Sequence, residues 1–129
     1  MNFATICEQY AKIINGESRL IKDGCSVEIG RHLSVTIQGR PSHSALPAGI
    51  TFESMDHSGN ALNLGEVVLL EEELPAFVQV LVKNNLIVSA IHNHWMFTHP
   101  PILYVHFQSV EHPLSFAQKV AEAFRTFKY

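Results

Sequence analysis

The stretch LGEVVLLEEELPAFVQVLVKNNLIVSAIHNHWMFTHPPILYVHFQ, residues 64–108, contains the clearest structural signals in this chain of 129 residues. It opens with an apolar run, residues 64–70, which is typical of a strand covered on both faces. The glutamates at 71–73 and Pro75 then indicate the first turn of a helix, where acidic side chains complement the helix dipole and proline is tolerated. Apolar residues at helical spacing continue this helix to Asn84, and two strands are expected over residues 86–94 and 102–108.

The flanking segments predict further helices and strands. Residues 3–14 have helical apolar spacing, and a final helix is expected to begin at Pro113. Residues 25–29 and 33–38 are expected to pair as a hairpin, residues 39–49 to form a loop, and residues 50–55 to form another strand. The order of elements predicts a single α+β domain over residues 1–129, with a mainly antiparallel sheet and helices packed against it.

The composition agrees with one compact domain and excludes some partners. Hydrophobic residues make up 47% of the chain and charged residues 16%, which is ordinary for a globular protein. The formal net charge is −3, and the nine lysines and arginines are scattered along the chain. Because a nucleic-acid backbone is bound through clustered positive charge, we expect no nucleic-acid partner.

The N-terminal sequence and the cysteines bear on the cellular location. Glu8 and Lys12 fall inside the segment that would have to be apolar in a secretory signal, and no window approaches the roughly 18 apolar residues of a membrane span. Cys7 and Cys25 are expected to be reduced thiols, since a core rich in aliphatic residues does not need a disulfide. We therefore expect a cytoplasmic protein with no membrane partner.

Four of the eight histidines lie between residues 92 and 106, and three of them can share one face of a sheet. His92 and His94 are two residues apart on a predicted strand, so they point to the same side while Asn93 points to the other. His106 joins them if His92 lies opposite His106 across the hairpin, whereas a slip of one residue would turn His106 to the other face. The apolar residues 103, 105 and 107 favour the first register, because they are expected to face the helices.

Three imidazoles on one face predict a divalent transition-metal site. Neutral imidazole binds zinc, nickel, copper or iron, and three protein ligands with an open fourth position are typical of catalytic sites. Glu66 is the best candidate for an additional ligand, because a carboxylate in an apolar strand needs a partner. The expected uses are hydrolysis, through a metal-bound water, or the binding of a small molecule.

Two alternatives do not require a metal. In the first, the histidines bind a small molecule by hydrogen bonds in a pocket that includes Trp95 and Tyr104. The same loop carries Met96 and Phe97, so it would expose several apolar side chains in a row unless a second subunit covered them, which suggests a homodimer. In the second, a histidine acts as a general base in a metal-free enzyme, although the sequence has no recognisable nucleophile motif.

Residues 65–127, GEVVLLEEELPAFVQVLVKNNLIVSAIHNHWMFTHPPILYVHFQSVEHPLSFAQKVAEAFRTF, resemble the C-terminal signature of the LppY/LpqO family, a bacterial family whose molecular function is not established. The specific parts are residues 90–94, AIHNH, and residues 105–107, VHF, and the similarity extends weakly through residues 32–41. The resemblance singles out His92, His94 and His106 from the other histidines and implies no activity.

Two departures from the family pattern bear on the site. Relatives tend to carry Gly-Asp where this chain has Gly65-Glu66, so the resemblance implies that a carboxylate is retained. Relatives usually have Pro-Arg where this chain has Pro100-Pro101. The missing arginine argues against a shared role in binding an anionic substrate.

Overall fold

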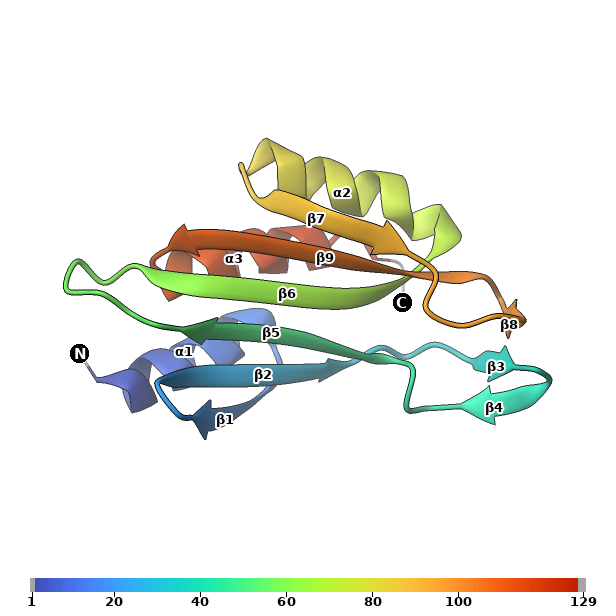
Figure 1. The fold of residues 1–129 in the computed structure, drawn as a ribbon, viewed down its shortest axis with the longest axis horizontal. Coiled ribbons are helices and arrows are strands. Elements are labelled where there is room, and N and C mark those ends of the chain that lie inside the picture. The colour runs from blue at the N-terminus through green and yellow to red at the C-terminus, as the bar shows by residue number, and fades with distance from the viewer. Residues whose placement is uncertain (1, 128–129) are drawn as a thin grey trace.

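The computed structural model describes residues 2–127, in which the chain forms three α-helices, one 3-10 helix and nine strands (Figure 1). In chain order the elements are α1 (Phe3–Ile14), β1 (Glu17–Ile21), β2 (Gly24–Gly30), β3 (Val35–Ile37), β4 (Arg40–Ser42), β5 (Pro47–Glu53), β6 (Ala61–Leu70), η1 (Glu71–Glu73), α2 (Leu74–Lys83), β7 (Ile87–His92), β8 (Thr98–His99), β9 (Ile102–Glu111) and α3 (Pro113–Phe124). The main sheet has strand order β1-β2-β5-β6-β9-β7, and a small sheet has order β4-β3-β8. All pairings are antiparallel, which confirms the predicted α+β class.

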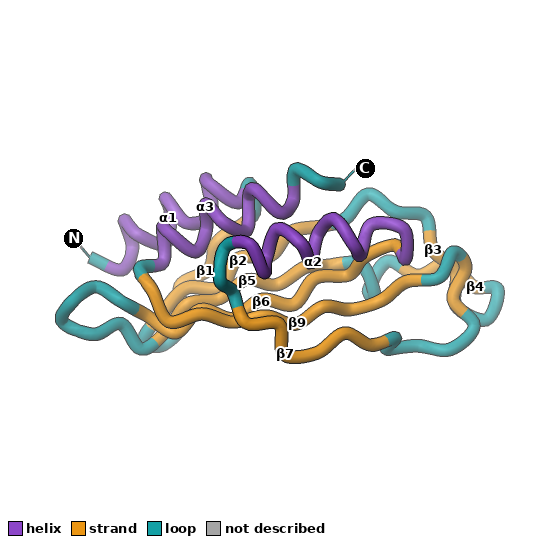
Figure 2. Tube along the Cα trace, turned by 90° about the horizontal axis from the view of Figure 1, so that it is seen from above, coloured by secondary structure: helices purple, strands orange, loops and turns teal. Residues whose placement is uncertain are grey.

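The three helices lie on one face of the main sheet (Figure 2). Alternate residues of the strands point toward them, because side chains along a strand alternate between the two faces. In β6 and β9 the helix-facing residues include Val67 and Phe107, which are buried with Phe77 of α2 and Phe116 of α3 in the main core. The intervening residues of the same strands therefore point to the opposite side, which we call the open face.

The small sheet covers one end of the open face. Its Val35 packs with Val68 of β6 and with Tyr104 and Ile102 of β9, and these residues belong to a second buried cluster. The cover explains why the C-terminal half of β6 is apolar on both faces, as the run in residues 64–70 predicts. The rest of the open face stays accessible.

The predicted hairpin of residues 25–29 with residues 33–38 is wrong. β2 instead lies between β1 and β5, while β3 pairs with β4 and β8 in the small sheet. The physical reason is burial: Cys25 and Val27 of β2 are fully enclosed beneath α1, which requires neighbouring strands on both sides. β1 has no buried residue and β4 lies in the predicted loop, so neither gave a hydrophobic pattern to detect.

The two cysteines are not reduced as predicted, because Cys7 of α1 and Cys25 of β2 form a disulfide. Both residues face the core between helix and sheet, and their Cα atoms lie 5.5 Å apart, within the range that a disulfide spans. Disulfides persist mainly in oxidising compartments, which argues against the cytoplasmic location, and that location stays a prediction. No helix within the described residues has the length and apolarity needed to cross a bilayer.

Candidate functional site

Glu66, His106 and His92 lie on the open face of three adjacent strands, β6, β9 and β7 (Figure 1). Glu66 is directly opposite His106 in the pairing of β6 with β9. His106 is opposite Ala90 in the pairing of β9 with β7, and His92 is opposite Tyr104. His92 therefore lies diagonally across from His106, offset by two residues from the register considered from the sequence. An offset of two keeps both histidines on one face, as the alternation of side chains requires.

A β-bulge at Ser89 gives His92 this orientation. Val88 pairs with Phe107, which points to the helices, whereas Ala90 already pairs with His106 on the open face. The additional residue between them reverses the alternation of all the following residues. If the pairing of Val88 with Phe107 continued regularly along the strand, His92 would lie opposite Leu103. Leu103 is on the helix side of the sheet, together with Val105 and Phe107.

The three side chains are close enough to interact. The Nε2 atoms of His92 and His106 are 3.0 Å apart, and the two rings are inclined by 22°. The Nε2 atom of His106 lies 3.9 Å from Oε1 of Glu66. The His106 side chain is 33% exposed and that of Glu66 is 49% exposed, so the group is accessible to solvent and to ligands. The fold therefore brings together three residues that the sequence selected. Two of them, Glu66 and His92, are more than 20 residues apart in the chain.

His94 lies near this group but is held less firmly. β7 ends at His92, not at residue 94 as predicted, so His94 belongs to the exposed segment that follows. Its ring centroid is 5.5 Å from that of His92, 5.0 Å from that of Tyr104 and 4.7 Å from that of Trp95. His94 is thus positioned by contacts with aromatic rings, and His99, in β8, belongs to the small sheet.

The ring of Tyr104 packs against the rings of His92 and His94. Its ring stacks on His92 with a centroid distance of 6.2 Å, and its hydroxyl donates a hydrogen bond to the backbone carbonyl of Ala45. Burial raises the pKa of the Tyr104 hydroxyl above its ordinary value, and the negative charge of Glu66 raises it further. The hydroxyl therefore stays protonated near neutral pH and keeps its role as a donor. Tyr104 thus supports His92, and its predicted role in binding a ligand stays a prediction.

A shallow trough of about 370 Å³ borders His106 and Glu66 on the open face. Its lining also includes Gly49 and Thr51 of β5 and Leu64 of β6. Ser89 of the bulge and Gln108 of β9 complete the polar part of the lining. These residues were not predicted as site residues, because only the pairing of four strands brings them together.

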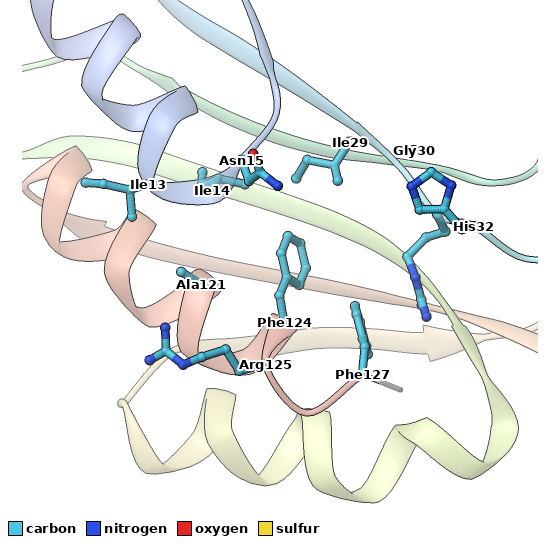
Figure 3. A pocket seen from close by; sticks show the side chains of 11 residues that line it. Ile13, Ile14, Asn15, Ile29, Gly30, His32, Ala121, Phe124, Arg125 and Phe127 are labelled. Atoms are coloured by element: carbon cyan, nitrogen blue, oxygen red, sulfur yellow. The ribbon is translucent and has the colours of Figure 1, made fainter. Parts of the chain in front are cut away.

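A different hollow, of about 320 Å³, lies between the C-terminal ends of α1 and α3 and the end of β2 (Figure 3). Its walls are largely apolar and include Ile29, Phe124 and Phe127. Its polar lining groups are Asn15, Arg31, His32 and Arg125. The hollow shares no residue with the histidine group and has no carboxylate in its lining. The lining of this hollow therefore offers a carboxylate-free, partly cationic surface, in contrast to the trough beside Glu66.

No three histidine, cysteine, aspartate or glutamate side chains within residues 2–127 are arranged to hold a metal ion without rearrangement. In the group of His92, His106 and Glu66, the closest approaches are the 3.0 Å between the two Nε2 atoms and the 3.9 Å between His106 and Glu66. In the present conformation the two imidazoles can share one proton, with one Nε2–H donating to the other Nε2.

Comparison with known families matches residues 8–126 to the family described as Domain of Unknown Function (DUF1259). The chain belongs to this family. No curated protein and no solved structure matches the chain. The matched range includes Glu66, His92, His94 and His106, so the candidate site lies within the domain that defines the family.

Proposed function

We propose that this domain binds a divalent transition-metal ion through His92 and His106, with Glu66 as the third ligand and His94 close enough to assist. The observation that carries the proposal is the 3.0 Å distance between the two imidazole nitrogens. Two nitrogens bound to one tetrahedral zinc ion, each at about 2.0–2.1 Å, lie roughly 3.3 Å apart. The pair is thus already near the spacing that a shared ion requires.

Metal binding requires a limited rearrangement. The rings must turn so that both lone pairs point to one position, and the ion replaces the proton that the pair can share. The half-exposed Glu66 side chain can move its carboxylate the remaining distance, since 3.9 Å from His106 is only slightly longer than the spacing between two ligands of one ion. An ion held by three protein groups keeps an open position for water or a small ligand, which suits hydrolysis or ligand binding.

The test is metal retention by the purified protein and by variants. Elemental analysis and thermal unfolding with added Zn²⁺, Ni²⁺ or Cu²⁺ are the measurements. A metal at 100 times its Kd stabilises a protein by about 2.7 kcal/mol, which raises Tm by roughly 10 °C for a domain of this size. We expect this increase for the wild-type chain and for His99→Ala, and its loss in His92→Ala and His106→Ala. Absence of bound metal together with an unchanged wild-type Tm would refute the proposal.

We also infer that the chain is a relative of the LppY/LpqO proteins. The family match over residues 8–126 includes most of the segment on which that resemblance rests, including AIHNH and VHF. The inference predicts that related chains pair the same two histidines across neighbouring strands. A structure of an LppY or LpqO protein in which the corresponding imidazoles lie apart would contradict it.

A second candidate function, self-association, is supported by the segment after the site. Trp95, Met96 and Phe97 are 46%, 67% and 72% exposed, and together they form an apolar surface beside His94. Exposed apolar patches of this kind mark interaction sites in soluble proteins. Light scattering tests this function: a dimer that Trp95→Ala converts to a monomer, without loss of metal, would favour it. A monomeric wild-type protein would exclude it.

A further inference from the structure

We propose that the trough beside Glu66 and His106 binds a hydroxyl-bearing molecule that carries no negative charge, such as a sugar, and that Gly49 keeps the trough open. The inference rests on the proposed function for the position of the ion, which would lie at one end of the trough, while the side chains of the lining select the bound molecule. It adds the chemical class of the ligand and a residue that controls access to it.

Gly49 opens the trough because of its place in the sheet. It lies opposite Glu66 on one side and opposite Glu28 on the other, in a row that crosses β2, β5 and β6. A Cβ atom at Gly49 would have no heavy atom within 4 Å, so the space above this residue is empty. Larger side chains at this position would fill the trough without displacing a neighbour.

The lining offers hydrogen bonds from neutral groups. Thr51 and Ser89 have hydroxyl groups, and Gln108 has an amide with both donors and an acceptor. Leu64 is 39% exposed and forms an apolar surface between them. A sugar has the matching surface, with hydroxyl groups around an apolar ring face.

The charges near the trough disfavour an anion. Its lining contains the carboxylate of Glu66 and neither lysine nor arginine. Glu28 on β2, opposite Gly49, adds a second negative charge. Arg19 on β1 is farther away, because Ser26 of β2 lies between Arg19 and Thr51 across the sheet. Without a bound ion, a phosphate or carboxylate ligand would therefore enter a negative field with no cation in the lining to pair with it.

Three matched sugars test the ligand class by NMR titration of the protein freed of metal with a chelator, so that no bound ion can attract the anion. Methyl β-glucopyranoside is uncharged, glucose 6-phosphate is an anion and glucosamine is a cation. We expect the neutral sugar to shift the amide signals of Thr51, Ser89 and Gln108, and the phosphate to leave them unchanged. Glucosamine should shift the same signals, because its positive charge suits the negative field. Binding of the phosphate, or no shifts with the neutral sugar, would overturn the assignment.

Gly49→Val tests the role of the glycine, with Gly30→Val as the matched control. A Cβ atom at Gly30 would also have no heavy atom within 4 Å, but Gly30 does not line the trough. We expect Gly49→Val to weaken binding of the neutral sugar by about tenfold or more, which corresponds to roughly 1.4 kcal/mol, and Gly30→Val to leave it unchanged. Thr51→Val, which keeps the shape of the side chain, should weaken it as well.

Zinc affinity, measured in the same samples, separates the two proposals. Both glycine variants should bind zinc like the wild-type protein. If zinc binds but the sugar affinity is the same in Gly49→Val as in the wild type, the trough assignment is wrong and the metal site stands. If zinc does not bind to the wild-type protein, the metal site is wrong.

Discussion

Val88 and His92 point to opposite faces of the main sheet, although residues four apart on a regular strand share a face. Val88 is paired with the helix-facing Phe107, and His92 is paired with Tyr104 on the open face. The bulge at Ser89 separates them and gives His92 its 3.0 Å approach to His106. With Ser89 in the chain, the bulge thus sets the face to which His92 points.

Deletion of Ile91 should abolish the metal-induced increase in Tm, whereas deletion of Ser89 should preserve it. Without Ile91, His92 follows Ala90 directly and would lie opposite Val105 on the helix side of the sheet. Without Ser89, Ala90 follows Val88 directly, and His92 stays opposite Tyr104 on the open face. Deletion of Met96 in the exposed segment after β7 is the control, since it shortens the chain without altering the bulge. Circular dichroism shows whether each variant is folded. A folded Ile91 deletion that retains the full metal response would show that the face to which His92 points does not matter for the site.

The two neighbours of His92 should differ in their contribution to metal affinity. His106→Ala removes a nitrogen held in the centre of the sheet, so the affinity for zinc should fall below detection. His94→Ala removes a side chain beyond the end of β7, and we expect only about a tenfold loss, the size typical of supporting groups. Isothermal titration calorimetry measures both. Equal losses in the two variants would make His94 a full ligand.

Glu111 should make the stability of the domain sensitive to acid. Burial by itself would raise the pKa of Glu111, but hydrogen bonds from Lys119, Ser109 and Ser115 outweigh burial and hold the pKa below its ordinary value. A carboxylate with a lowered pKa in the folded state stabilises the protein above the unfolded-state pKa, and this stabilisation is lost as the pH falls through the folded-state pKa.

Urea unfolding of Glu111→Gln measures this effect. At neutral pH the variant should be less stable than the wild type by about 1–2 kcal/mol, because a charged acceptor is lost. The difference should shrink as the pH falls from about 5 to 2. A difference that is constant over this range would mean that the charge of Glu111 does not stabilise the fold.

The buried ion pair of Arg31 and Glu73 should be costly to break on one side. Nη2 of Arg31 donates a hydrogen bond to Oε2 of Glu73 at 2.7 Å, and Nη1 donates one to the backbone carbonyl of Val68. The guanidinium also lies 3.7 Å from the centre of the Phe127 ring. Arg31→Met leaves a buried carboxylate without its partner, which should destabilise the domain by about 3–5 kcal/mol.

The double variant Arg31→Met/Glu73→Gln should recover a large part of this loss. Glutamine removes the buried charge and keeps an acceptor for the backbone N–H of Leu70, which Glu73 now provides. A double-mutant cycle from denaturant unfolding gives the coupling between the two residues. Additive losses would show that the pair is not coupled.

The disulfide should account for a measurable part of the stability. Cys7 and Cys25 are 18 residues apart, and closing a loop of this length stabilises the folded state by about 3 kcal/mol in the chain-entropy model. We expect Cys7→Ser/Cys25→Ser to lower Tm, and a reductant to lower the wild-type Tm to a similar value. Reaction of the denatured, non-reduced protein with a thiol reagent should detect no free thiol; two free thiols would argue against the disulfide.

The sequence by itself determined the helices, the buried strands and the α+β class, because each depends on the local spacing of apolar residues. Val67 and Leu69 of β6, and Phe77 of α2, are buried as this spacing predicts. It also selected Glu66, His92 and His106, through the alternation of β9 and through the need of a carboxylate in an apolar strand for a partner.

Only the tertiary structure decided how the strands pair, and with it the geometry of the site. The bulge at Ser89, the position of β2 between β1 and β5, and the placement of Gly49 next to Glu66 all depend on contacts between residues far apart in sequence. The disulfide belongs to the same class, since it requires α1 to pack on β2. Hydrophobic spacing specifies which face of an element is buried, but a partner strand is chosen by the packing of the whole core.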